Sequence, residues 1–500
     1  MQFKSKGSLF YTNTMKRFLT TTFAVLFCIT LFGQGSDDAC LFSQTFYQGT
    51  AKALGMGNAM GAVGGDMTAV CINPAGMGIY RSDEFTTTLN LLDNYHHTSY
   101  YGTNNGANKM RLSIPNLGWV NTKQRSNFRP LRFTQFGIGL TRLNDYNLNT
   151  YAKGINPTSS KIDEYLGRID GYSQYELQDA FPFDIYPAWS TYLIDLYEDE
   201  IGPYYSSPVP QGNIWQSQEN HFIGRSEEWT FAGSANFYDK LYLGASANLR
   251  HIKREGTREF QESRVEGTDT DFNQWSFKED LVSDAWGGNV KVGFLYHANP
   301  WFRIGAAFHS PSIYNFDKSW QTETESQINW ITRKYISPNS NYEYTFISPL
   351  KWVGSMAFVI GQQGIISFDA EYTNFGAAQF MAATDDDYDY SPTNEIIKST
   401  YGKTMNFRLG SEWNLGSSYL RLGATFYGSP YGLGETDGSV QKGTCGISIP
   451  ASASTTFDFA YEFSYCASDI VLYDAGVLGI EPIKQKQFKN NLAVTLKVRF

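Results

Sequence analysis

The amino-acid sequence predicts an all-β protein, a 14-stranded antiparallel transmembrane β-barrel with an N-terminal hatch that plugs the lumen. Three observations predict this fold: strands with an apolar residue at every second position, an even number of such strands, and connections that alternate between short and long. The composition agrees, because 18% of the residues are charged and 16% are aromatic, whereas soluble domains contain about 25% charged residues. The net charge of -9 argues against nucleic acid as a partner, since phosphate binding needs a basic face.

Residues 1–35 are expected to be an N-terminal extension and a signal peptide. Met15 and two basic residues precede an apolar stretch from Phe23 to Phe32, and small residues follow. This order is typical of a secretory signal. We expect cleavage near residues 33–35, with translation starting at Met1 or Met15. The apolar stretch is too short for a membrane anchor, which needs about 20 residues.

Fourteen later segments alternate between apolar and polar residues, as half-buried strands do. In the last segment, every second residue from Leu492 to Phe500 is apolar. Bacterial outer-membrane barrels have an even number of strands, each about ten residues long. The expected strands are residues 85–94, 111–121, 131–142, 229–238, 241–250, 287–296, 301–309, 349–360, 364–373, 404–415, 418–428, 443–450, 455–466 and 488–500.

The connections between these segments alternate in length. Short or medium connections at 122–130, 239–240, 297–300, 361–363, 416–417 and 451–454 separate long ones, of which 143–228 is the longest. Short periplasmic turns and long external loops are typical of outer-membrane barrels. A secreted protein built from several β-sandwich domains is the alternative, but it gives no reason for this alternation. We therefore expect an integral multi-pass barrel in the outer membrane of a Gram-negative bacterium.

In such a barrel, aromatic residues face lipid and the strand charges line the lumen. The expected partners are outer-membrane lipid and the barrel assembly machinery, which would recognise the terminal Leu496, Val498 and Phe500. Residues 36–84 do not alternate and are rich in glycine. They are expected to form the hatch, and residues 85–500 the barrel with its long extracellular loops.

Three motifs in the expected hatch carry a resemblance to a known family. They are Ala-Leu-Gly-Met-Gly-Asn-Ala-Met at 53–60, Gly-Gly-Asp-Met-Thr-Ala at 64–69 and Asn-Pro-Ala-Gly-Met at 73–77. Later segments, such as Arg-Leu-Gly-Ser-Glu at 408–412, agree. The chain resembles the FadL family of outer-membrane transporters for long-chain fatty acids and other hydrophobic compounds.

The resemblance implies passive uptake of a hydrophobic small molecule: capture by the external loops, transfer to a lumen pocket, movement of the hatch and lateral exit through the wall. It implies hatch or gating roles for seven residues. These are Gly55, Gly57, Gly65, Asp66, Asn73, Pro74 and Ala75. Pro74 would fix its backbone φ angle and Asn73 would cap a turn.

The longest loop is expected to contain short amphipathic helices. Its side chains Trp189, Tyr192, Leu193 and Leu196 are candidates for ligand capture, although a loop that packs on itself as a lid would show the same residues. No catalytic motif, metal-ligand spacing or cofactor motif is present, so we expect no enzyme activity, no metal and no cofactor.

Two other functions remain open. The protein is alternatively an outer-membrane scaffold or carrier for secreted surface proteins, which would need exposed loop surface rather than a lumen pocket. A haem receptor is a further alternative, because His96 and His97 could ligate an iron porphyrin from a loop beyond the first strand. An oxidising compartment would permit disulfides between Cys40 and Cys71 or between Cys445 and Cys466.

Overall fold

The computed structural model describes residues 35–125, 130–200, 202–268, 270–383, 388–432, 437–473 and 479–500. The expected signal peptide, with both candidate start residues, lies outside the described residues except for Gly35. Residues 36–500 form one compact unit, which contains all the helices and strands that the structure describes. No helix in the described ranges is long and apolar enough to cross a membrane.

Among the described residues, fourteen antiparallel strands close into a barrel, as predicted. β1 pairs with β2 on one side and with β21 on the other, and this second pairing closes the sheet. Each expected strand matches one barrel strand. In order around the barrel these are β1 (Glu84–Tyr100), β2 (Thr103–Gln124), β3 with β4 (Leu131–Asp145, Leu148–Asn156), β7 (Ile214–Phe237), β8 (Leu241–Arg264), β9 (Phe272–Asn299), β10 with β11 (Phe302–His309, Ile313–Ile328), β13 with β14 (Ser340–Ile347, Lys351–Ile360), β15 with β16 (Gly364–Asn374, Gln379–Ala382), β17 (Lys403–Asn414), β18 (Tyr419–Tyr427), β19 (Val440–Pro450), β20 (Thr455–Ile470) and β21 (Ile483–Arg499).

Several barrel strands are longer than expected. β7, β8 and β9 have 24, 24 and 28 residues, whereas a strand that crosses a bilayer needs about 9–11. Near the short turns, apolar side chains point outward: Val292 and Phe294 are 50% and 40% exposed, and Lys291, next to Val292, is buried. A closed barrel with an apolar outer belt and a polar lumen is the architecture of integral proteins of the bacterial outer membrane.

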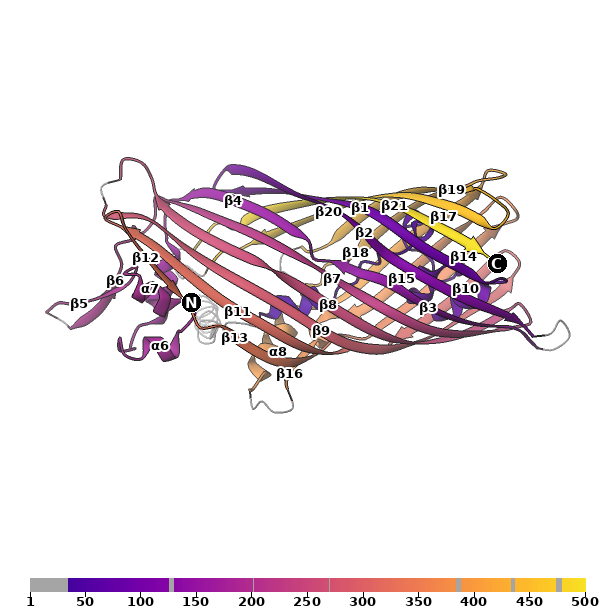
Figure 1. Cartoon of the computed structure of the whole chain (residues 1–500), viewed down its shortest axis with the longest axis horizontal. Coiled ribbons are helices and arrows are strands. Elements are labelled where there is room, and N and C mark those ends of the chain that lie inside the picture. Colours follow the sequence, from indigo (N-terminus) through magenta and orange to yellow (C-terminus); the bar gives the residue numbers. More distant parts are fainter. Residues whose placement is uncertain are drawn as a thin grey trace, which may run out of the picture. The chain divides into compact units, whose positions relative to one another are not determined.

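A group of short helices and strands, called the cap below, covers the ends of the long strands away from the short turns. Figure 1 shows this cap at the end of the barrel opposite to the C-terminus. It contains α5 (Lys161–Arg168), α6 (Leu177–Ala180), α7 (Ile185–Ser190), the hairpin β5–β6 (Asp195–Glu198, Pro203–Ser206) and β12 (Ile331–Ile336), which pairs with β11. A separate apolar cluster that includes Ile162, Ile185 and Trp275 forms its core.

One buried carboxylate anchors the cap to the barrel. Glu262 near the end of β8 accepts hydrogen bonds from Ser160 Oγ at 2.6 Å, the Lys161 amide at 2.9 Å, Gln216 Nε2 at 2.7 Å and Trp275 Nε1 at 2.7 Å. The first two donors lie at the start of α5, and the others lie on the wall strands β7 and β9. Glu262 therefore ties the first cap helix to the wall.

Residues 36–83, called the inner segment below, lie inside the barrel. They contain α2 (Ser36–Ser43), α3 (Ala51–Gly55), α4 (Met67–Ile72) and the 3-10 helix η1 (Pro74–Ile79). Met56, Met60 and Ile72 of this segment pack with wall residues such as Leu295 and Val353 in one buried cluster. The remaining short elements, η2 (Phe375–Ala377) and α8 (Ser391–Thr400), lie beside α2.

Candidate functional site

The inner segment is held in shape by buried caps. Asp66 is the N-cap of α4 and accepts a hydrogen bond from the Thr68 amide at 2.9 Å. Thr50, the N-cap of α3, donates its hydroxyl to the same carboxylate at 2.7 Å. One fully buried side chain, Asp66, thus joins the starts of two short helices that could not persist alone.

The Asn-Pro-Ala motif joins the inner segment to the wall. Asn73 Oδ1 accepts a hydrogen bond from the Ala75 amide at 3.1 Å, and Pro74 occupies the first position of η1. The turn-capping role expected for Asn73 is therefore present. Its Nδ2 also donates to the carbonyls of Gly61 at 2.9 Å and of Phe294 on β9 at 3.0 Å. The same side chain thus fixes a turn and binds the barrel.

The glycines of the inner segment lie where the backbone turns or touches the wall. Gly57 and Gly65 have φ angles of 59° and 65°, a region that favours glycine. The carbonyls of Gly55 and Gly57 accept hydrogen bonds from Thr444 Oγ1 at 3.2 Å and Thr425 Oγ1 at 2.7 Å. Five of the seven predicted residues therefore lie against wall strands: Gly55, Gly57, Asn73, Pro74 and Ala75.

Wall glycines complete this contact, and the sequence analysis did not single them out as site residues. A Cβ on Gly423 would lie 2.3 Å from the Gly57 nitrogen, and one on Gly244 would lie 2.4 Å from the Pro74 carbonyl carbon. A Cβ on Gly410 would lie 2.3 Å from the Met56 oxygen. Their signal in the sequence is a glycine within an alternating strand, which often marks the close approach of another backbone.

Buried charges of the wall also face the inner segment. Lys291, paired with Glu228, donates to the Cys71 carbonyl at 2.9 Å. Asp369 accepts from the Gly61 amide at 3.0 Å. Such paired and hydrogen-bonded charges can be buried without the full cost of desolvation. The strand charges line the lumen, as predicted, and they hold the inner segment there.

A cavity of about 270 Å³ lies in the lumen between the inner segment and the wall. This cavity is called the lumen pocket. Its apolar lining comes from Leu41 and Phe46 of the inner segment and from Leu92, Tyr146, Leu148, Tyr431 and Val440 of the wall and loops. Its volume is close to the lower limit of typical ligand pockets, about 300 Å³.

The lumen pocket also contains cationic side chains. Lys442 is paired with Glu462 at 3.1 Å, and the guanidinium of Arg254 lies 3.8 Å above the Phe222 ring. Within the described residues, neither Arg254 nor Lys489 has a hydrogen bond or an ion pair. The pocket therefore combines an apolar lining with two cations that form no ion pair with any described residue.

The wall beside the lumen pocket has a seam. β2 pairs with β3 only from Asn116 to Gln124, and β3 ends where β4 begins, at residues 146–147. Beyond this break, β2 and β4 are joined by side chains instead of a backbone ladder in the described ranges. Asn149 Nδ2 donates to the Asn108 carbonyl at 3.2 Å, and Asn105 Nδ2 donates to the Lys153 carbonyl at 3.4 Å.

The four residues predicted for ligand capture lie in the cap but not on one surface. Tyr192 is 54% exposed, and the Arg333 guanidinium lies 4.5 Å from its ring centroid. Leu193 is fully buried in the cap core, while Trp189 packs against that core and Leu196 is half-buried in β5. The loop forms short helices, as expected, and most of its apolar side chains pack on one another.

The structure corrects the expectation for the two adjacent histidines. His96 and His97 lie within β1 rather than in a loop, so they point to opposite faces. His96 faces the lumen beside Gln487 Nε2 at 3.1 Å, and His97 faces outward. Two side chains on opposite faces cannot ligate one iron together, which removes the basis for the haem alternative.

The remaining sequence-based features also have defined positions. The four cysteines of the described residues are all free, so neither disulfide is formed. Leu496 and Val498 lie on the outer face of β21, and Phe500 is 75% exposed at its end. These three positions suit a terminal recognition signal, which stays a prediction.

Solved structures share this fold. No protein-family model and no curated protein sequence matches the chain. A Pseudomonas aeruginosa FadL homologue matches with a TM-score of 0.56 and 11% identity over 91% of this chain and 99% of that one. The P. putida toluene transporter TodX matches with 0.52 and 12% identity, covering 89% and 98%. The Ralstonia pickettii toluene transporter TbuX matches with 0.50 and 13% identity, covering 92% and 100%.

These likenesses extend over almost the whole of both chains, and TodX and TbuX are transporters rather than enzymes. At 11–13% identity, these likenesses show a shared fold and nothing more. The strand count, the closure by β1 and β21 and the position of the inner segment agree with this shared fold. The chain has the fold of the FadL homologue and the toluene transporters, a fourteen-stranded outer-membrane barrel with its own N-terminal segment inside.

Proposed function

We propose that this protein carries hydrophobic small molecules through the outer membrane by way of the lumen pocket. One observation carries the proposal: the pocket touches the inner segment and also Asn144 to Leu148, where the third barrel strand breaks. A solute in the pocket lies beside the seam between β2 and β4. Because side-chain bonds replace a ladder there, these strands separate at lower cost than fully paired ones.

The lining favours a ligand with an apolar body and an anionic head, such as a long-chain fatty acid. Leu41, Phe46 and Leu148 would contact the chain, and Lys489 and Arg254 would pair with a carboxylate. An anion in the pocket would neutralise cations that are partly withdrawn from water, which is favourable. The toluene transporters share the fold, but toluene carries no charge for these groups.

The inner segment would act as the hatch of this pathway. Leu41 and Phe46 belong to it, so its displacement would change the pocket directly. The motif residues Gly57 and Asn73 would hold the closed position through their wall contacts. Tyr192 on the cap would offer a first apolar contact to an arriving ligand.

The test is uptake of labelled oleate by bacteria that lack their own fatty-acid transporter and express this protein. We expect uptake above the empty-vector level. Lys489→Gln and Arg254→Gln should each lower it about tenfold, because each removes a charge-assisted bond worth about 1.5–3 kcal/mol. Lys123→Gln, an exposed lysine outside the pocket, is the matched control. Toluene uptake should not respond to any of these changes.

One outcome would contradict the proposal. Absence of oleate uptake by correctly folded protein would remove the transport function. If the same protein then captured secreted surface proteins through its cap, the scaffold alternative would replace it.

A further inference from the structure

A second cavity, larger than the lumen pocket, lies at the end of the barrel opposite to the cap. It has a volume of about 490 Å³ and is lined by the inner segment and by the short turns of the wall, including Gly361 and Gln362. Short turns face the periplasm in bacterial barrels, so this cavity is called the periplasmic cavity. The packed core of the inner segment, with Met56 and Met60 fully buried, separates it from the lumen pocket.

The acidic groups of the periplasmic cavity already have cationic partners. Glu84 pairs with Arg499 at 3.0 Å. Glu412 pairs with Arg421 at 2.6 Å. Glu412 also attracts Lys52, although the two side chains form no ion pair. Arg81, another cation of the lining, pairs with Asp239 of a neighbouring turn at 3.0 Å.

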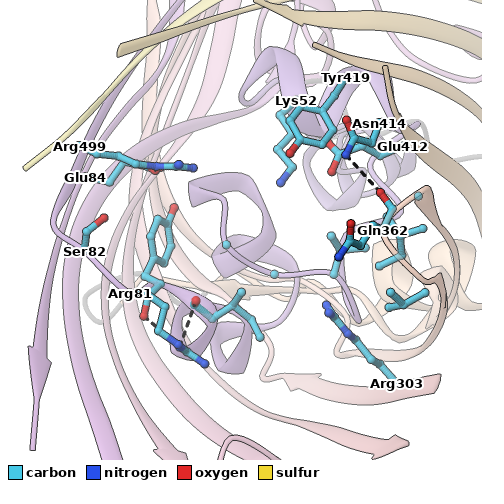
Figure 2. Close-up of a pocket in the computed structure, with 18 of the residues that line it drawn as sticks. Lys52, Arg81, Ser82, Glu84, Arg303, Gln362, Glu412, Asn414, Tyr419 and Arg499 are labelled. Atoms are coloured by element: carbon cyan, nitrogen blue, oxygen red, sulfur yellow. Dashed lines mark hydrogen bonds and ion pairs between the residues drawn. The ribbon is translucent and has the colours of Figure 1, made fainter. Parts of the chain in front are cut away.

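Two further cations of the lining form no ion pair with any described residue. Lys52 lies on α3 of the inner segment, and Arg303 lies on β10 of the wall. Neither side chain makes a hydrogen bond or an ion pair in the part of the chain that the structure describes. Figure 2 shows both side chains directed into the cavity, from different sides. Both are half-buried, so part of their hydration is lost. For Lys52 the attraction of Glu412 offsets this loss only in part.

The lining also contains apolar and neutral polar groups. Val63, Ile79 and Ile365 supply apolar surface, and Asn414 and Tyr419 supply neutral polar groups. A cavity of this volume lies within the range of ligand pockets, about 300–1,000 Å³. Arginine binds carboxylate and phosphate through a planar fork, and lysine acts as a compact charge. Together these features match a small organic anion and not a neutral hydrocarbon.

We propose that the periplasmic cavity is an anion-binding site for a small molecule that bears a carboxylate or a phosphate monoester and reaches it from the periplasm. Arg303 and Lys52 are its binding residues. Because one belongs to the wall and the other to the inner segment, a bound anion would join the two and hold the inner segment in place. This site is distinct from the lumen pocket, and its occupation does not depend on the transport proposed above.

The test is calorimetric titration of the full-length protein in an uncharged maltoside detergent at low ionic strength. The probes are octanoate and octyl phosphate, with acetate and inorganic phosphate as the corresponding free anions. We expect saturable binding of at least one probe. Arg303→Gln and Lys52→Gln should each weaken it about tenfold, since each removes one charge-assisted contact. Arg303→Lys should weaken it less, because the charge remains.

Two matched controls separate this site from others. Lys123→Gln removes an exposed charge from the same end of the barrel, outside the cavity lining. Lys489→Gln removes a cation of the lumen pocket. Lys123→Gln should not change the affinity. Lys489→Gln should weaken only the octanoate that enters the lumen pocket and should leave unchanged the binding that Arg303→Gln and Lys52→Gln weaken. Binding of the octyl probes alone would identify an amphiphile, and equal binding of the free anions would identify a free anion as the ligand. The proposal would be overturned if no probe bound saturably. It would also be overturned if neither Arg303→Gln nor Lys52→Gln changed the affinity.

Discussion

Single glycines of the wall leave the space that the inner segment occupies. We expect Gly423→Ala to displace the inner segment, because the new Cβ would lie 2.3 Å from the Gly57 nitrogen, a backbone atom. Overpacking of this kind costs about 1–3 kcal/mol. Ion conductance in planar bilayers should rise. Gly443→Ala on the neighbouring strand, where nothing lies within 4 Å of the new Cβ, is the control and should conduct like the unchanged protein. Equal conductance of both variants would contradict the expectation.

Asn73 is the residue that joins a turn of the inner segment to the wall. Asn73→Ala removes the bonds to the buried Gly61 carbonyl and the partly buried Phe294 carbonyl and leaves both without this donor. The expected loss is about 1–3 kcal/mol. Hydrogen exchange of residues 61–80 should become faster in the variant. Asn315→Ala, which alters an exposed asparagine of β11, should leave this exchange unchanged. Unaltered exchange in Asn73→Ala would assign the wall contact no role in holding the segment.

At the scale of elements, alternation predicted every barrel strand but not its full length. In the lower part of β9, apolar Val292 points outward to lipid and Lys291 points inward. In the upper part of the same strand, Trp275 points inward and Gln274 outward. The chemistry of the two faces reverses because the outer solvent changes from lipid to water. A prediction based on an apolar outer face therefore ends each strand at the edge of the membrane and misses the part that extends into water.

The cap is an element whose attachment depends on one carboxylate. Glu262→Gln replaces a group that accepts four hydrogen bonds by an amide whose nitrogen accepts none. We expect a loss of about 1–3 kcal/mol in the attachment of α5. Hydrogen exchange of residues 161–168 should accelerate. Glu259→Gln on the same strand, an exposed residue, is the control. Unchanged exchange in Glu262→Gln would show that other contacts hold the cap.

At the scale of the whole molecule, the two cavities could not be predicted from the sequence. The motifs located the inner segment, because short glycine-rich patterns persist within one stretch of chain. The lumen pocket, in contrast, joins Phe46, Leu148 and Lys489, which are far apart in sequence and come together only when the barrel closes. Lys489 alternates with its neighbours like any strand residue, and only the structure shows that it forms no hydrogen bond or ion pair within the described residues.

The final prediction concerns the seam between β2 and β4 and the path of the solute through the whole barrel. Asn108→Cys with Asn149→Cys would place a disulfide across it, at a contact that now consists of one side-chain hydrogen bond. The host variant would have Cys445 and Cys466 replaced by serine, since these are the cysteines that are not buried. If solutes leave laterally, oxidation should abolish oleate uptake and reduction should restore it, because a covalent link prevents the strands from parting. Glu219→Cys with Glu259→Cys, a directly paired and exposed couple on β7 and β8, is the control and should transport in both states. Uptake by the oxidised seam variant would exclude the lateral route and direct the solute past the inner segment to the periplasm.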